Sequence, residues 1–404
     1  MKSDMQWQSV GDLVVNYDRL RKPLSSRERE NRKGPYPYYG AACIFDYIDD
    51  YIFDGEYILL GEDGTVINED GTPVLQRISG KTWVNNHAHV LKNSELVDFD
   101  YLYYALKNAK FRSAVTGAVQ PKISQSNMNA VRVLIHSDRE EQKKVAAILK
   151  SLDDKIALNE EINDNLEQQA VLLFRSWFST FSQSENVSRN DSEFGEIPVD
   201  FSVVKIGNLP MLVTDYVANG SFASLKENVT LYQEPNYAYF VRNTDLKSGS
   251  FGAFVDQHSY EFLSKSTLYG GEIIISNVGD VGSVFLCPTL DRPMTLGNNI
   301  IMLRPEDDML RYYLYIWFKH LQGQALIQGI KGGSAQPKFN KTDFKKTSVI
   351  LPPTGLLSRF HDTVAPMFEA IDQNRAENAR LSSLRDALLP RLMSGELDVS
   401  YVDL

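Results

Sequence analysis

Two stretches of the chain carry apolar side chains at alternating spacings of four and three residues. In the first stretch these positions are Val145, Leu149, Leu152, Ile156, Leu166, Ala170, Leu173 and Trp177. In the second stretch they are Phe360, Val364, Met367, Ile371, Leu381, Leu388 and Leu392, at a constant offset of 215 residues, and Arg385 takes the place that corresponds to Ala170. This heptad spacing predicts two long helices that pack along each other.

Each stretch interrupts its apolar seam with two asparagines, Asn159 and Asn163 in the first and Asn374 and Asn378 in the second. A buried asparagine costs stability unless it finds a partner, and it fixes the register of a helix pair when it does. In an antiparallel pair, Asn159 meets Asn378 and Asn163 meets Asn374. We therefore interpret all four as register residues of an antiparallel coiled coil. The alternative is that they are the polar seam residues that any long helix pair carries. Pro366 predicts a kink or a break in the second helix.

The remaining sequence predicts globular domains. Its 404 residues suffice for one to three of them. Short strand-like runs, such as residues 57–60 and 131–135, alternate with glycine and aspartate turns, and residues 99–112 look helical. We predict an α+β fold, in which two strand-rich, mixed α/β domains are separated by the two helices. The predicted boundaries are 1–137 (the N-terminal head), 138–181 (central helix), 182–196 (linker), 197–352 (the C-terminal head), 353–394 (C-terminal helix) and 395–404 (tail).

The two heads also repeat, although more weakly than the helices. Gly55-Glu56 and the strand-like residues after them match Gly271-Glu272 at an offset of 216 residues, and Gln120-Pro121-Lys122-Ile123 matches Gln336-Pro337-Lys338-Phe339 at the same offset. Between these landmarks the two sequences differ almost completely. The chain is therefore predicted to be an internal pseudo-two-fold repeat of a head followed by a helix.

Composition and motifs exclude several classes of function. The chain lacks a phosphate-binding P-loop and the Asn/Asp-Pro-Pro-Tyr/Phe segment of amino-methyltransferases, so no enzyme activity is predicted. Cys43 and Cys287 form neither a disulfide framework nor a metal spacing. His87 and His89 lack a third nearby ligand in the sequence, so a structural pair or a nucleic-acid contact is favoured over a metal site. A polar N-terminus and the lack of a long apolar run predict a cytoplasmic protein without a membrane span.

Charge is distributed unevenly along the chain. The net charge of −10 argues against nucleic-acid binding when it is taken as a whole. Most of the acidic excess, however, lies in residues 138–195 and 353–404, so the nearly neutral heads can each present a basic face. Residues 19–33 are rich in Arg and Lys and precede several tyrosines, a combination that suits phosphate contact and base stacking. The alternative is a solvated loop beside core tyrosines.

A second basic stretch, residues 331–346, contains glycines that would let the backbone approach a phosphate, together with Ser and Gln donors. The alternative there is a glycine turn before a strand. The candidate DNA-binding residues of the whole chain are Arg21, Lys22, Arg27, Arg29, Arg32, Lys33, Tyr38, Tyr39, Gly64, Lys81, Gln120, Lys122, Arg242, Asn277, Gly279, Asp280, Lys331, Ser334, Gln336 and Lys338.

Several segments resemble the DNA-specificity subunits of type I restriction-modification enzymes over nearly the whole chain. They are residues 38–41, 50–56 and 62–64, the run Trp83-Val84-Asn85-Asn86-His87-Ala88-His89-Val90-Leu91, residues 271–276 and 279–282, and the closing Leu388-Leu389-Pro390-Arg391-Leu392-Met393-Ser394-Gly395-Glu396-Leu397. The closing segment is the most specific of them. Cys43 and Pro366 are small departures from the family pattern.

The resemblance implies a non-catalytic subunit that binds double-stranded DNA. Two target-recognition domains would each read one half of a bipartite, asymmetric sequence, and the helices would space them and dock two methyltransferase subunits. Restriction and motor subunits would join through these, making the complex a DNA adenine methyltransferase and an ATP-dependent endonuclease. S-adenosylmethionine, ATP and Mg²⁺ would bind to the partner subunits, and no cofactor to this chain. The alternative is a coiled-coil adaptor whose two heads bind proteins.

Overall fold

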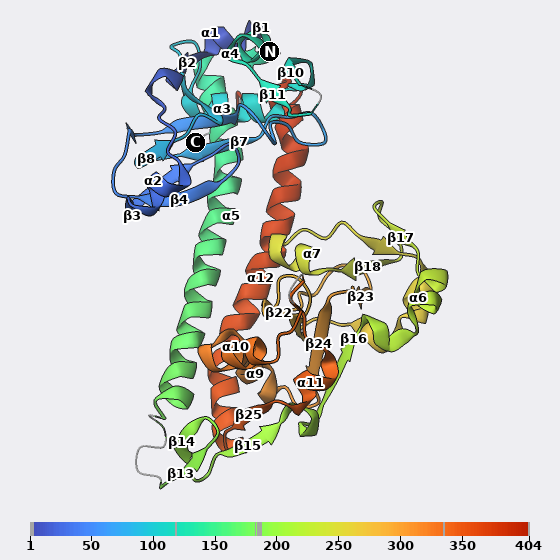
Figure 1. Ribbon diagram of the computed structural model, residues 1–404. Helices are drawn as coiled ribbons and strands as arrows, with labels where there is room; N and C mark the ends of the chain where they lie inside the picture. The colour runs from blue at the N-terminus through green and yellow to red at the C-terminus, as the bar shows by residue number, and fades with distance from the viewer. Residues whose placement is uncertain (1–3, 118, 182, 184–187, 334–335, 403–404) are drawn as a thin grey trace. The chain divides into compact units, whose positions relative to one another are not determined.

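The structure, a computed structural model, describes residues 4–117, 119–181, 183, 188–333 and 336–402 (Figure 1). The chain forms two compact units. Unit 1 comprises Met1–Asn159 and Glu377–Leu404, and unit 2 comprises Glu160–Ala376. Two long helices, α5 (Arg139–Phe174) and α12 (Thr354–Met393), contribute residues to both units. Within the described ranges, no helix has a stretch long and apolar enough to cross a membrane.

Unit 1 contains the N-terminal head. The main sheet of this head has the strand order β2-β9-β6-β7, with every neighbouring pair antiparallel. A second sheet has the order β4-β3-β8-β5, in which β3 and β8 run parallel. Two further pairs are β1 with β12 and β10 with β11. The strands are β1 (Met5–Ser9), β2 (Val14–Asn16), β3 (Lys33–Tyr39), β4 (Ile44–Ile48), β5 (Phe53–Asp54), β6 (Tyr57–Gly61), β7 (Leu75–Ile78), β8 (Lys81–Val84), β9 (Ala88–Asn93), β10 (Val115–Thr116), β11 (Lys122–Ile123) and β12 (Arg132–His136).

Helix α3 and the ends of the two long helices enclose one hydrophobic core of unit 1. Helix α3 begins after Asp98, whose side chain accepts a hydrogen bond from the backbone of Tyr101 at 3.1 Å. The core joins α3 and the main sheet to the first turns of α5 and the last turns of α12, where Leu149 and Leu392 are buried. The helices are α1 (Val10–Leu13), α2 (Ser26–Glu30), α3 (Phe99–Asn108), α4 (Gln125–Ala130) and the 3-10 turns η1 (Asp18–Leu20) and η2 (Arg112–Ala114).

Unit 2 contains the C-terminal head. Its sheets have the orders β16-β24-β21-β22 and β17-β19-β18-β23-β20, with the smaller pairs β15-β25 and β13-β14. The strands are β13 (Arg189–Ser192), β14 (Gly195–Pro198), β15 (Ser202–Lys205), β16 (Met211–Asp215), β17 (Leu231–Tyr232), β18 (Ala238–Val241), β19 (Phe254–Val255), β20 (Thr267–Leu268), β21 (Ile273–Ser276), β22 (Val284–Leu286), β23 (Met294–Leu296), β24 (Ile300–Pro305) and β25 (Ser348–Leu351). The helices are α6 (Phe222–Asn228), α7 (Asn243–Ser248), α8 (Gln257–Phe262), α9 (Met309–Lys319), α10 (Leu321–Gly329) and α11 (Lys341–Lys346).

The main sheets of the two heads have the same design, which confirms the predicted internal repeat. The order β2-β9-β6-β7 corresponds to β16-β24-β21-β22, and both sheets are antiparallel throughout. The matched runs of the sequence, residues 57–59 and 273–275, lie in β6 and β21, which occupy the same position in the strand orders of the two sheets. These two strands are buried because both faces of their sheet are covered, which explains their continuous apolar sequences.

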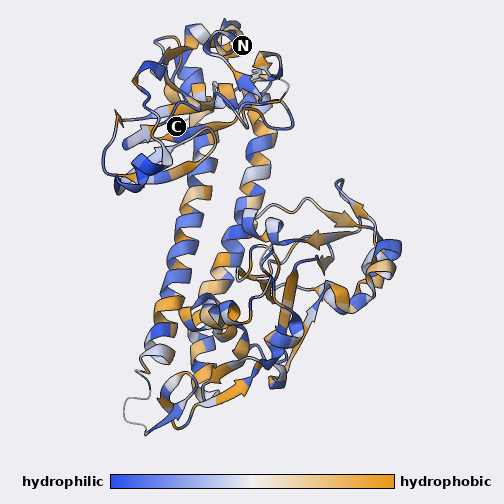
Figure 2. Cartoon of the chain, viewed as in Figure 1, coloured by the Kyte–Doolittle hydropathy of each residue, from blue (hydrophilic) through white to orange (hydrophobic). Residues whose placement is uncertain are grey.

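The two long helices pair through the predicted asparagine layers. In unit 1, Asn159 Nδ2 donates to Asn378 Oδ1 at 2.8 Å. In unit 2, Asn374 Nδ2 donates to Asn163 Oδ1 at 2.9 Å. Each pairing is the one that an antiparallel arrangement predicts. Figure 2 shows hydrophilic and hydrophobic residues alternating along α5 and α12, as amphipathic helices require.

The structure differs from three local expectations. Of the kink or break expected at Pro366, the break is absent: helix α12 runs through Pro366, and Val364 and Phe368 on either side of it are buried in the core of unit 2. The predicted linker 182–196 contains β13 and the start of β14, which form a hairpin and bury Ile197. Helix α3 ends at Asn108, before the predicted limit at residue 112.

Candidate nucleic-acid interface

Each head carries a short β-hairpin that contains the repeated Gln-Pro-Lys sequence. In the N-terminal head, β10 pairs with β11 through Thr116 and Lys122. In the C-terminal head, the backbones of Gly332 and Lys338 exchange two hydrogen bonds of 2.8 and 2.9 Å. The paired residues of the two hairpins differ by the same 216 positions that relate the two sequences. The sequence repeat is therefore a structural repeat at these hairpins.

Both hairpins dock on a glycine turn by equivalent backbone contacts. The amide of Gly64 donates to the carbonyl oxygen of Pro121 at 3.1 Å. The amide of Gly279 donates to the carbonyl oxygen of Pro337 at 3.0 Å. Next to these bonds, the amide of Ile123 donates to Glu62 O at 2.8 Å, and in the second head the amide of Phe339 donates to Asn277 O at 3.0 Å. Each hairpin is thus anchored to the main sheet of its own head.

Two glycines inside the hairpins show why their backbones match. Gly117 and Gly333 both have a φ of +87°, which favours glycine. A Cβ on Gly117 would lie 2.3 Å from the carbonyl oxygen of Gln120, and a Cβ on Gly333 would lie 2.6 Å from that of Gln336. Both contacts are too short for any other residue, so glycine is required at the same position of each hairpin.

The hairpins present polar side chains to solvent. Gln120 and Lys122 are exposed in the N-terminal head, and Gln336 and Lys338 are exposed in the C-terminal head. Lys122 Nζ lies 3.2 Å from a carboxylate oxygen of Glu62, while half of its side-chain surface remains exposed. The structure therefore brings together predicted candidates of each head beside Gly64 and Gly279, respectively. Ser334, another candidate, lies outside the described residues.

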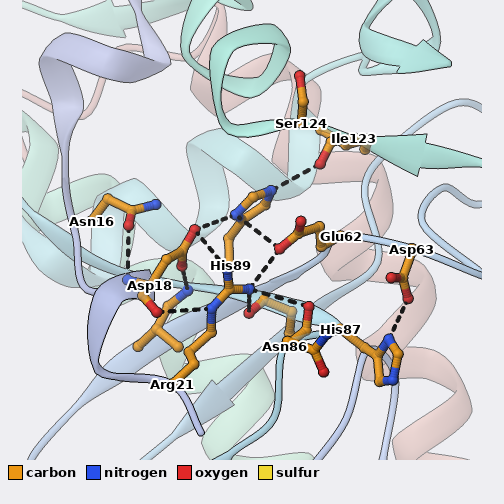
Figure 3. Close-up of polar contacts among 12 residues, drawn as sticks. Asn16, Asp18, Arg21, Glu62, Asp63, Asn86, His87, His89, Ile123 and Ser124 are labelled. Atoms are coloured by element: carbon orange, nitrogen blue, oxygen red, sulfur yellow. Dashed lines mark hydrogen bonds and ion pairs between the residues drawn. The ribbon is translucent and has the colours of Figure 1, made fainter. Parts of the chain in front are cut away.

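A network of charged groups contacts the N-terminal hairpin on its buried side, where His89 faces Ile123 (Figure 3). His89, on β9, is only 1% exposed. Its Nε2 lies 2.9 Å from the carbonyl oxygen of Ile123, and its Nδ1 lies 2.6 Å from Asp18 Oδ2 and 3.7 Å from Glu62 Oε2. Arg21 completes the network by donating to Glu62 at 2.6 Å. Because Glu62 also approaches Lys122, the network reaches the exposed edge of the hairpin.

The pKa values of the two carboxyl groups reflect this network. Burial raises the pKa of Asp18, but the hydrogen bond and charge of His89 and the backbone bond from Val90 outweigh burial, so the pKa lies below its usual value. Burial likewise raises the pKa of Glu62, and the hydrogen bond from Arg21 and the charge of His89 lower it further than burial raises it. Both groups are therefore carboxylates at neutral pH.

Fewer positive charges of residues 19–33 are available for phosphate contact than the sequence suggests. Arg29 and Lys33 pair with Asp46, at 3.4 and 2.6 Å, and Arg32 pairs with Asp49 at 2.8 Å. These acids follow in the adjacent strand β4 and the turn after it, and they offset the positive charge. Arg21 is likewise turned inward to Glu62, which leaves Arg19, Lys22 and Arg27 as the exposed cations of this stretch for which the described residues show no ion pair.

The tyrosines after this stretch require a correction. The ring of Tyr38 is only 1% exposed, and its hydroxyl accepts a hydrogen bond from the amide of Leu24 at 2.9 Å. It belongs to the core and cannot stack on a base, so its assignment as a DNA-binding candidate was wrong. Tyr39 is half-buried and packs against the hydrophobic cluster around Phe53. The core alternative considered for these tyrosines is therefore the one that applies to Tyr38.

The other candidates occupy separate positions. Lys81 is exposed, and its Nζ lies 4.6 Å from the centre of the Tyr51 ring. Arg242 forms two hydrogen bonds to Asp245, which hold it at the start of α7. The remaining contacts are Asn277 Nδ2 to Phe339 O at 3.1 Å, Asp280 to Lys247 at 2.7 Å, and Lys331 to Gln328 at 2.8 Å.

The two histidines of the N-terminal head do not converge on one site. His87 lies in the turn before β9 and contacts Asp63 at 2.6 Å, whereas His89 faces Asp18 (Figure 3). Asp18, Glu62 and His89 offer ligand atoms within 4.8 Å of one another and could hold a metal. However, the facing nitrogen of His89 already contacts Asp18, and Arg21 already bonds Glu62. We therefore assign the group as an internal ion-pair network.

Sequence reasoning missed Asp18 and Glu62, because their partner His89 lies 71 residues from the first of them. A signal was nevertheless present. Glu62 stands two residues before the turn glycine Gly64, and Asn277, a DNA-binding candidate, stands two residues before Gly279. Aligning the two heads on these glycines would have placed Glu62 beside the hairpin.

Comparisons with known proteins agree with this architecture. The family described as type I restriction modification DNA specificity domain matches residues 2–168 and 198–356. The chain is 28% identical to the type I restriction enzyme MjaIX specificity subunit of Methanocaldococcus jannaschii, over 74% of this chain and 69% of that protein. It is 24% identical to the putative type I restriction enzyme specificity subunit S.HindORF215P of Haemophilus influenzae, over 87% and 84% of the two chains.

One solved structure shares the fold over the whole chain. The crystal structure of the type I restriction-modification system S subunit from M. genitalium superposes with a TM-score of 0.57, at 16% identity, and covers 96% of both chains. The duplicated heads, the paired helices and the two matched segments of the family account for almost all of the sequence. The chain belongs to the type I restriction-modification DNA specificity family.

Proposed function

We propose that this chain is the DNA-recognition subunit of a type I restriction-modification complex, and that each head reads one half of a bipartite, asymmetric DNA sequence. The observation that carries the proposal is the pair of matched hairpins. Both heads hold the same backbone beside a glycine turn, and both expose a glutamine and a lysine from it. A shared backbone with different surrounding side chains suits two domains that perform one task on different sequences.

The exposed side chains suit two kinds of DNA contact. A lysine such as Lys122 or Lys338 offers a positive charge to a phosphate, which strengthens binding without selecting a sequence. A glutamine such as Gln120 or Gln336 can pair with a base edge in the major groove, adenine above all. The residue that precedes the turn differs, since it is Glu62 in one head and Asn277 in the other. This difference supports two unlike half-sites.

The chain itself is proposed to be non-catalytic. Methyl transfer would come from two methyltransferase subunits that dock on the chain, and DNA cleavage from restriction and motor subunits that join through them. S-adenosylmethionine, ATP and Mg²⁺ would then bind to those partners, and the complex would act on DNA in the cytoplasm. Family membership supports this assignment, as do two heads that each carry a hairpin suited to DNA.

An exchange of heads tests the proposal. Residues 197–352 are replaced by the matching domain of a relative, the chimera is assembled with the methyltransferase subunits, and the methylated sequence is determined by sequencing treated DNA. We expect one half of the recognised sequence to change and the other to stay. A change in both halves, or in neither, would contradict the assignment of one half-site to each head.

A gel-shift series distinguishes DNA recognition from a protein-binding adaptor. The purified chain and its methyltransferase complex are mixed with random duplex DNA at low and moderate salt. Binding that depends on phosphate contacts must weaken steeply as the salt concentration rises. A complex that does not bind the duplex at low salt would favour the adaptor.

A further inference from the structure

In each head a side chain contacts the same carbonyl oxygen of the hairpin, but the side chain is of a different type. In the N-terminal head, the carbonyl oxygen of Ile123 faces His89 Nε2 at 2.9 Å. In the C-terminal head, the equivalent oxygen of Phe339 accepts a hydrogen bond from Asn277 Nδ2 at 3.1 Å. Ile123 and Phe339 directly follow the exposed lysines of their hairpins. Each anchor therefore fixes the strand that carries a proposed phosphate contact.

The N-terminal anchor uses both nitrogens of the His89 ring. Nε2 of His89 must carry a hydrogen, because it faces a carbonyl oxygen that can only accept. Nδ1 faces carboxylate oxygens of Asp18 and Glu62, which are acceptors as well. Both contacts are satisfied together only when the ring carries two hydrogens. The other charges around the ring are the cations Arg21 and Lys122, which pair with Glu62.

The position of the ring is fixed from both sides. Asp18 Oδ1 accepts a hydrogen bond from the amide of Val90 at 2.8 Å, so the carboxylate is tied to the strand that carries His89. Arg21 also donates to the carbonyl oxygen of Ala88 at 2.7 Å, on the same strand. The ring therefore has one orientation, and in it Nε2 is directed at the hairpin (Figure 3).

The C-terminal anchor is electrically neutral. Asn277 is an amide, and its backbone is fixed by hydrogen bonds to Asn299 at 3.1 Å and to Phe339 at 3.0 Å. In the main sheet, the place of His89 opposite Leu60 is taken by Ile301 opposite Ile275. An apolar, buried residue thus stands where the N-terminal head has its histidine.

We propose that His89 and Asn277 are the positioning residues of the two hairpins, and that only the N-terminal hairpin is anchored through a network of charged groups. This inference deepens, and rests on, the proposal that the hairpins contact DNA. It assigns a separate anchor to each half-site. Loss of the contact between His89 and Ile123 would loosen the reading of one half-site and leave the other unchanged.

Hydrogen exchange of the full-length chain measures each anchor without DNA. The reporters are the amides of Gly64 and Ile123 in one head and of Lys338 and Phe339 in the other, all four of which donate within their hairpin contacts. Removal of one anchor should speed exchange only at the pair of amides in its own hairpin. The pair in the other hairpin is the internal control and should exchange as in the wild-type chain.

Substitutions separate positioning from general structure. His89→Leu removes the donor and should make the N-terminal reporters exchange about tenfold faster, the effect of losing one buried hydrogen bond. His89→Gln offers an uncharged donor of similar reach, so it should restore protection. Asn277→Leu should loosen only the C-terminal reporters. Even if His89→Leu fails to fold, the comparison of His89→Gln with Asn277→Leu decides the question.

The same variants, assembled with methyltransferase subunits, connect the anchors to DNA. His89→Leu should relax one half of the methylated sequence, and Asn277→Leu the other half. Unchanged exchange at Gly64 and Ile123 in His89→Leu, or equal loosening of both hairpins in either variant, would overturn the positioning roles. Loosened hairpins with an unchanged methylated sequence would instead overturn the hairpins' part in reading DNA, and with it the proposed function on which this inference rests.

Discussion

Replacing Asn378 by leucine tests whether the asparagine layers hold the helices in register. Asn159, its partner, is completely buried. Nδ2 of Asn159 donates to Asn378 Oδ1 at 2.8 Å and to Glu377 at 2.7 Å, and its Oδ1 accepts from Lys155 at 3.0 Å. Asn378→Leu removes one of these bonds and leaves a buried amide short of a partner. Such a loss costs about 1–3 kcal/mol.

The double variant should behave differently from its parts. Asn159→Leu/Asn378→Leu replaces both amides by apolar side chains, so neither is left unpaired. Each single substitution should lower the free energy of unfolding. We expect the double variant to lose about 1–2 kcal/mol less than the sum of the two single losses. Urea denaturation of the full chain measures all three. Ala157→Leu, on the exposed face of the same helix, is the control and should lie within about 0.5 kcal/mol of wild type.

Register itself is measured through the spacer of the methylated sequence. A slip of one heptad moves one helix along the other by about 10 Å, which corresponds to about three base pairs. The chain with all four asparagines changed to leucine should be more stable, yet it should methylate substrates with altered spacers or form mixed oligomers. A quadruple variant that keeps a single oligomeric state and the wild-type spacer would refute the reasoning. So would a double variant whose change in unfolding free energy equals the sum of the two single changes.

Three further predictions concern single side chains. Lys338→Ala should weaken duplex binding for all sequences and lower the salt slope by about one unit, measured by gel shifts over a salt series; an unchanged slope would exclude a phosphate contact. Glu62 has a lowered pKa, so its carboxylate stabilises the fold above about pH 4 and the contribution is lost as the pH falls through its folded pKa. Glu62→Gln should therefore flatten acid unfolding followed by fluorescence, and an unchanged profile would contradict this. Pro366→Ala restores a backbone donor inside α12 and should stabilise the chain by up to about 3 kcal/mol in urea, whereas no gain would mean that the helix already accommodates the ring.

Features that follow from regular spacing along the chain could be predicted from the sequence alone. The heptad seam predicted two long helices and paired Asn159 with Asn378 and Asn163 with Asn374, because helix geometry fixes which seam positions meet. The offset between the heads likewise located the matched hairpins. In both cases the prediction required only spacing along the chain.

Features that depend on tertiary contacts could not be predicted in this way. The cations of residues 19–33 looked available, but Asp46 and Asp49 neutralise them from the neighbouring strand. Tyr38 looked exposed because its neighbours are polar, although β3 directs its ring into the core. Pro366 should break an isolated helix, but burial of the residues on either side of it stabilises the helical path.

The comparison of the two heads explains why their repeat is so faint in the sequence. The shared elements are backbone contacts, such as those of Gly64 and Gly279. Such contacts require a particular residue type, glycine, at only a few positions. The side chains that support each hairpin, His89 in one head and Asn277 in the other, satisfy the same carbonyl by different means. A backbone that requires few particular side chains leaves most positions free to differ. Two heads built on it can therefore hold the same hairpin in the same place while surrounding it with residues suited to different DNA sequences.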